Sequence, residues 1–127
     1  MPTALSLKRV PYGIDSFTDV RNGNCAYIDK TRYIEILETS GSDKPFIVRP
    51  RRFGKTLFTS ILSAYYDRNQ TDNFDKLFAG TYIASHKTDL ANQFCILRLE
   101  FAGLSSSSDI ELRFKNCVWN KLQIFFN

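Results

Sequence analysis

The distribution of apolar residues predicts three extended segments along the chain. Phe46-Ile47-Val48 is apolar without interruption, as expected of a strand that is covered on both faces of a sheet. Phe94 to Phe101 is a longer run of the same kind, and Cys25 to Ile28 is a brief third candidate. These runs alternate with helical patterns in the order strand, helix, strand, helix. That order favours a parallel α/β sheet flanked by helices.

Periodic apolar positions predict the helices between these runs. Leu57, Phe58, Ile61, Leu62 and Tyr65 form the stripe of a helix that continues to Tyr66 and packs on a sheet. An earlier helix, capped by Asp29 or Thr31, ends near Gly41, and its apolar positions are Tyr33, Ile34, Ile36 and Leu37. Asp72 to Phe78 is expected to be a short helix that Gly80 stops.

The last predicted helix begins at a capping box, Ser108-Asp109-Ile110-Glu111, after a serine-rich linker. Its apolar stripe consists of Ile110, Phe114, Val118, Leu122 and Phe125. The chain then ends on Ile124-Phe125-Phe126, an apolar run that predicts poor solubility or self-association if the domain is incomplete.

Length and charge narrow the class of protein. A chain of 127 residues corresponds to about one domain, which is short for a complete P-loop nucleotidase. The net charge is +4, and residues 1–56 contain ten Lys/Arg against six Asp/Glu, whereas residues 57–127 contain seven of each. Four of the positive charges lie between residues 49 and 55, which favours a local phosphate site over an extended nucleic-acid surface.

The remaining composition argues against several other classes. Cys25, Cys95 and Cys117 are odd in number and widely spaced, so they predict free, buried thiols in a reducing cytoplasm rather than disulfides or a zinc site. The sole histidine, His86, lies in a polar stretch and is expected to be solvated. The first ten residues lack the apolar core of a signal peptide, and no run approaches transmembrane length.

The segment Arg49-Pro50-Arg51-Arg52-Phe53-Gly54-Lys55-Thr56 carries the strongest chemical signal. It ends in Gly-Lys-Thr between a predicted strand and a predicted helix, which is the context of a Walker A loop. Lys55 would neutralise the β- and γ-phosphates of ATP, Thr56 would ligate Mg²⁺, and the N–H groups of residues 52–56 would surround phosphate oxygens. Arg49 occupies the position of the usual first glycine. The alternative is an ordinary turn followed by a threonine cap.

Three motifs in order resemble those of the bacterial AAA-ATPase-like family. They are Pro11-Tyr12-Gly13-Ile14-Asp15-Ser16-Phe17, Tyr27-Ile28-Asp29-Lys30-Thr31 and the loop of residues 49–56. The resemblance is close from Pro11 to about Tyr66, and Arg at position 49 is the form that the family itself has. It implies a P-loop nucleotidase-like parallel sheet, incomplete at the C-terminus. Residues 1–43 would be an N-terminal segment, and residues 44–127 would contain the strand, the loop, its helix and the following strand and helix.

The resemblance also implies parts that the sequence lacks. Members of the family have an acidic Walker B strand after the region corresponding to Asn127, and many have a C-terminal domain resembling restriction endonucleases. No catalytic residue is therefore assigned, and the chain alone is expected to bind nucleotide weakly and to hydrolyse it negligibly. Glu100 is interpreted as paired or solvated rather than as a Mg²⁺ ligand.

The sequence thus predicts a cytoplasmic, ATP- and Mg²⁺-binding portion of an AAA-like ATPase. Arg49, Arg51 and Arg52 are expected to contact phosphate or to anchor the loop to a carboxylate such as Asp29. Contact with nucleic acid through a missing nuclease domain is a further expectation. The alternative hypothesis is a non-catalytic, truncated module that binds an anion, a nucleic-acid backbone or a partner protein. Neither hypothesis distinguishes ATP from GTP.

Overall fold

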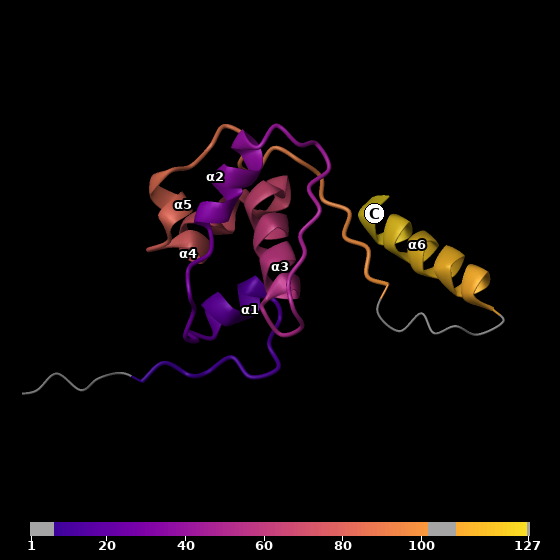
Figure 1. The fold of residues 1–127 in the computed structure, drawn as a ribbon, viewed down its shortest axis with the longest axis horizontal. Helices are drawn as coiled ribbons and strands as arrows, with labels where there is room; N and C mark the ends of the chain where they lie inside the picture. The colour runs from indigo at the N-terminus through magenta and orange to yellow at the C-terminus, as the bar shows by residue number, and fades with distance from the viewer. Residues whose placement is uncertain (1–6, 102–108, 127) are drawn as a thin grey trace, which may run out of the picture. The chain divides into compact units, whose positions relative to one another are not determined.

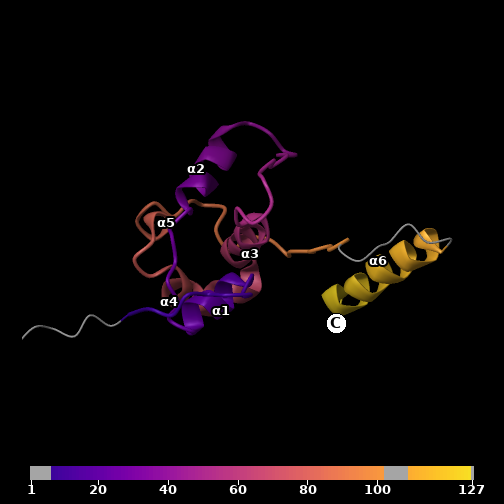
Figure 2. The ribbon, with the colours of Figure 1, turned by 60° about the horizontal axis from the view of Figure 1, so that its bottom comes forward.

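A computed structural model describes residues 7–101 and 109–126 of the chain. These residues divide into two compact units, one ending at Phe94 and one beginning at Cys95. The first unit contains six short helical segments, and Figures 1 and 2 label its five α-helices. The six segments are α1 (Phe17–Asn22), α2 (Arg32–Thr39), α3 (Lys55–Tyr66), the 3₁₀ helix η1 (Arg68–Asn73), α4 (Phe74–Phe78) and α5 (Tyr82–Ser85). The second unit contains α6 (Ile110–Phe126).

The core of the first unit is built from aromatic and aliphatic side chains around α3. Helix α1 packs against α3 and α4, and α5 packs against α2 and α4. Phe78 is fully buried at the centre, with ring centroids 5.0 Å from Phe17, 5.7 Å from Tyr65 and 4.8 Å from Phe74. Each such side chain contributes about 1.5–3 kcal/mol by leaving water. This core holds α3 through its buried residues, which lie between Ser60 and Tyr65.

Hydrogen bonds across the first unit add specificity to this packing. The buried amide of Phe17 donates to the hydroxyl of Ser60 on α3 over 2.9 Å. The hydroxyls of Tyr66 and Tyr82 donate to the carboxylates of Glu38 and Glu35, over 2.8 Å and 2.7 Å. Helix α2 is therefore attached to α3 through one carboxylate and to α5 through the other.

The predicted parallel sheet is wrong, because no strand forms within residues 7–101 and 109–126. Only two isolated parallel bridges occur there, between Arg9 and Cys25 and between Asp67 and Phe94. A strand needs a neighbouring strand for its hydrogen bonds, and neither the run at 46–48 nor residues 95–101 have such a partner within their own unit. Phe46 and Val48 are 90% and 74% exposed, so the apolar run is not covered on both faces.

The periodic patterns were better guides, since helix α3 matches the predicted stripe. Helix α2 also forms, with Thr31 at its N-cap, and α4 ends before Gly80, whose φ is 71°. Ser108 of the predicted capping box lies outside the described residues, as does the linker of residues 102–108. Helices α1 and α5 were not predicted, because both are too short to show a period.

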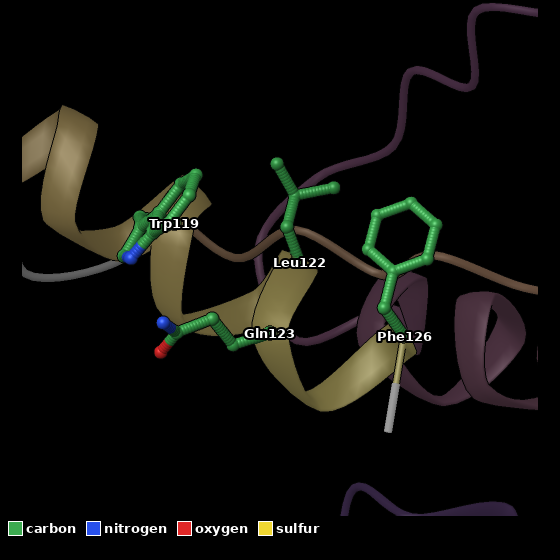
Figure 3. Close-up of a pocket in the computed structure, with 4 residues that line it drawn as sticks. All are labelled: Trp119, Leu122, Gln123 and Phe126. Carbon is green, nitrogen blue, oxygen red and sulfur yellow. The ribbon is translucent and has the colours of Figure 1, made fainter.

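The second unit is an extended segment followed by α6. Within it, the ring of Phe101 stacks on Phe114 at 5.4 Å, and the thiol of Cys117 donates to the carbonyl of Glu100. Figure 3 shows Trp119, Leu122 and Phe126 along α6, spaced so that they follow one helical face, with Gln123 beside them. Among the described residues, no helix is both long enough and apolar enough to span a membrane.

The three cysteines and the single histidine were predicted to be free thiols and a solvated side chain. Cys25, Cys95 and Cys117 are all free, as predicted, although only Cys25 is buried. His86 is exposed, as expected, and its ring stacks on that of Tyr82 with centroids 4.1 Å apart.

Candidate functional site

The loop of residues 49–56 enters α3 through an unusual main-chain conformation. Arg52 and Gly54 have φ angles of 67° and 77°, whereas Phe53 and Lys55 have negative φ angles. Arg52 is notable, because a left-handed conformation costs an ordinary residue roughly 1–2 kcal/mol. Alternation of this kind turns successive N–H groups toward one side and forms a concave anion-binding nest.

The N-terminus of α3 leaves its first amide groups available. Its N-cap is Gly54, which has no side chain to accept a hydrogen bond, and its first turn contains no acidic residue. The amide of Phe58 already donates to the Gly54 carbonyl over 2.8 Å. The amides of Lys55, Thr56 and Leu57 have no acceptor among the described residues. Free N–H groups at the positive end of a helix dipole favour an anion.

The side chains of the loop add positive charge without acidic neighbours. Lys55, Thr56, Arg51 and Arg52 are exposed. Within the described parts of the chain, no salt bridge involves a residue of this loop. Arg49 keeps a φ outside the left-handed region, as expected, but its guanidinium lies 5.2 Å from the centre of the Tyr33 ring rather than at a carboxylate. Arg49 therefore has an aromatic support.

Asp29 does not anchor these arginines. Its carboxylate accepts from the amide of Thr31 over 2.9 Å and from the amide of Tyr82 over 2.6 Å. The hydroxyl of Thr31, which is fully buried, accepts from the amide of Ile83 over 3.1 Å. Asp29 and Thr31 thus hold the start of α5, where the first amides of the helix need acceptors.

Lys30, between these two residues, contacts the loop, and this contact was not predicted from the sequence. Its ammonium donates to the Phe53 carbonyl over 3.3 Å. The same nitrogen would lie 3.5 Å from a Cβ at Gly54, so it sits beside the residue that caps α3. Lys30 both fixes the loop and adds a cation to it. The only signal in the sequence was its place in the motif Tyr27-Ile28-Asp29-Lys30-Thr31.

A cavity of about 450 Å³ opens beside the loop in the first unit. Arg52, Phe53 and Gly54 form its loop wall. The rest of the lining comes from residues 10–11, Val20, residues 26–28 and Lys30, and α3 contributes Leu57, Phe58 and Ile61. The candidate phosphate loop and this cavity therefore share three consecutive residues.

Glu100 belongs to the second unit and is paired, as predicted. Its carboxylate lies 3.2 Å from the guanidinium of Arg98, and its side chain is 58% exposed. In the described ranges, no group of three or more His, Cys, Asp or Glu residues is arranged to hold a metal ion.

A comparison against known families assigns most of the chain to one of them. The chain belongs to the family described as predicted AAA-ATPase, whose model matches residues 11–127. Over 110 residues it is 33% identical to a protein of Azotobacter chroococcum mcd 1 described as "Uncharacterized protein in vnfD 5'region". The aligned region covers 84% of this chain and 20% of that protein, so the chain spans about a fifth of its relative. No solved structure matches the chain.

Proposed function

We propose that the loop of residues 49–56 binds the phosphate groups of a nucleotide, ATP in the first instance. The observation that carries the proposal is the alternation of φ at Arg52 and Gly54 directly before an uncapped helix N-terminus. Such a main chain presents several amides to one anion. The family name, predicted AAA-ATPase, supports a nucleotide as that anion.

In this proposal each side chain of the Walker A loop has a separate role. Lys55 follows the capping glycine and would neutralise the β- and γ-phosphates. Arg51 and Arg52 are exposed and unpaired with any described carboxylate, so they are available to phosphate oxygens. Arg49 would instead support the loop through its contact with Tyr33.

The residues fit Mg²⁺ that enters with its nucleotide. Mg²⁺ commonly keeps several water ligands and binds through few protein groups together with substrate phosphates. Thr56 is exposed in the first turn of α3, and its hydroxyl makes no hydrogen bond to a described residue. Thr56 would supply one oxygen ligand, and the ion would offset the negative charge of the phosphates.

Other proposals about partners rest on the sequence alone. Contact with nucleic acid through a nuclease-like domain of a longer protein, and self-association through the apolar residues Ile124 to Phe126, both stay predictions.

Binding of ATP and GTP to the Lys55→Ala variant tests the proposal. Loss of a charge-assisted phosphate contact should weaken ATP binding by about one to two orders of magnitude. Lys76→Ala is the matched control, because Lys76 is an exposed lysine on α4 and is not part of the loop. Isothermal titration with and without Mg²⁺ measures the affinities, and far-UV circular dichroism checks folding. Unchanged ATP affinity in folded Lys55→Ala protein would refute the role of this loop.

A further inference from the structure

We propose that residues 97–101 pair with the same residues of a second copy of this chain, as two antiparallel strands related by a two-fold axis at Leu99. This surface lies in the second unit, and the proposal does not depend on nucleotide binding. Residues 95–101 follow an extended path before α6 (Figure 1). Among the described residues, their amides have no acceptor, and of their carbonyls only that of Glu100 accepts a hydrogen bond, from the Cys117 thiol. A main chain in this state is able to take up a neighbouring strand.

The two faces of this extended segment differ in chemistry. The Arg98 guanidinium lies 3.2 Å from the Glu100 carboxylate, so both side chains lie on one face, as alternation along an extended chain requires. The positions between and beside them form the other face. These are Leu97, Leu99 and Phe101, which are 40%, 36% and 49% exposed. One face is therefore charged, the other is apolar, and both are accessible to a partner.

The charged face selects a single register for this pairing. In an antiparallel pair, only the register centred on Leu99 sets Arg98 directly opposite Glu100 of the partner subunit. Each arginine then has one glutamate beside it on its own strand and another across the pair, so that the four charges alternate in sign. Opposite charges at directly opposed positions stabilise paired strands, whereas like charges destabilise them. Parallel pairing in register would set Arg98 against Arg98 and is disfavoured.

The apolar face and α6 support the same pairing. The axis sets Leu99 against Leu99 and Leu97 against Phe101 of the partner subunit, so apolar side chains meet across the pair. Two strands alone are marginally stable in water, but packing against a helix stabilises them. That helix is α6, because the Phe101 ring stacks on Phe114 with centroids 5.4 Å apart. An unrelated strand would fit both faces only if it had the same alternation, which a second copy supplies by symmetry.

Reversal of the two charges tests the pairing. Sedimentation velocity over a range of concentrations should show a weak monomer–dimer equilibrium for the wild-type protein. Arg98→Glu and Glu100→Arg each set like charges opposite one another, so each should raise the dimer dissociation constant by about tenfold or more. The double reversal restores both cross-strand pairs and should bring the constant within about threefold of the wild-type value. The matched control is Glu111→Lys with Lys115→Glu, which reverses an ion pair on α6 and should leave the dimer unchanged.

A disulfide at the axis tests the register directly. In protein that carries Cys95→Ser and Cys117→Ser, the further change Leu99→Cys should give a covalent dimer under mild oxidation. Directly opposed Cα atoms of an antiparallel pair lie about 4.5–5.5 Å apart, a separation that a disulfide spans. Cys25 is buried and does not compete. Leu90→Cys, at an exposed position of the first unit, is the control and should stay monomeric.

Three results would overturn the proposal, with circular dichroism as the check that each variant folds. The first is a wild-type protein that stays monomeric at every concentration. The second is a dimer with the same dissociation constant in Arg98→Glu, Glu100→Arg and wild-type protein. The third is self-association that persists in both single reversals and is lost in Phe126→Ser, which would place the contact on α6 instead of on the extended segment.

Discussion

Replacing Gly54 by alanine tests whether the left-handed turn before α3 forms the anion site. Gly54 has φ 77° and ψ 27°, a conformation that costs an L-residue roughly 1–2 kcal/mol. A Cβ there would meet only the Lys30 ammonium, at 3.5 Å, which is ordinary contact. The loss of stability in Gly54→Ala should therefore come from backbone strain and not from a steric clash of the new methyl group. We expect Gly54→Ala to lower the free energy of unfolding by about 1 kcal/mol.

A matched glycine separates loss of stability from loss of binding. Gly80 has φ 71°, and nothing lies within 4 Å of its hypothetical Cβ, so Gly80→Ala carries a similar strain after α4. Urea unfolding followed by circular dichroism should show comparable losses for both variants. Only Gly54→Ala should weaken ATP and tripolyphosphate binding, by about tenfold, because relief of its strain turns the amides of the nest apart. Equal nucleotide affinities in the two variants would refute the reasoning.

Two further predictions concern the support of the site. Ser60→Ala should lower the free energy of unfolding, measured with urea, by about 1–3 kcal/mol, because it leaves the buried Phe17 amide without its acceptor. The control is Ser85→Ala, at an exposed position, and an equal loss of stability in the two variants would contradict this prediction. Burial raises the pKa of Tyr27 from its ordinary value of 10.0 to about 12 in the folded chain. Above pH 10 the unfolded chain therefore loses this proton first, and the free energy of unfolding should fall as the pH rises from about 10 to 12. Urea unfolding across that pH range should show a smaller fall in the free energy of unfolding for the Tyr27→Phe variant. An identical fall in the variant and the wild-type protein would show that Tyr27 does not cause the pH dependence.

The elements that could be predicted are those whose signal is local. The stripe from Leu57 to Tyr65 specifies α3, since each apolar residue finds its neighbour one turn away within the same helix. The apolar runs at 46–48 and 94–101 misled the prediction because a sheet depends on a distant partner, which composition does not identify. Helix α5, with four residues, depends on Asp29 and Thr31, more than fifty residues earlier in the chain.

The same distinction applies to the candidate site. The loop was identified because its residues are consecutive and match a motif with a known mechanism. Lys30 was not assigned to it, because its bond to the Phe53 carbonyl crosses 23 positions in sequence. A carboxylate or a phosphate was expected to contact Arg49, and within the described residues its guanidinium lies over the ring of Tyr33. Charge alone does not distinguish an ion pair from a cation over an aromatic ring.

Lys30 gives the motif of residues 27–31 a physical meaning within this fold. Asp29 and Thr31 fix the main chain on either side of it by binding the amides of Tyr82 and Ile83. With both neighbours held, the Lys30 side chain is directed to the turn that places Arg52 and Gly54 in left-handed conformations. The cost of that turn is then offset by contacts to the well-packed part of the first unit, as expected of a strained functional loop. The loop of residues 49–56 and the segment of residues 27–31 therefore act as one structural element, although the sequence separates them.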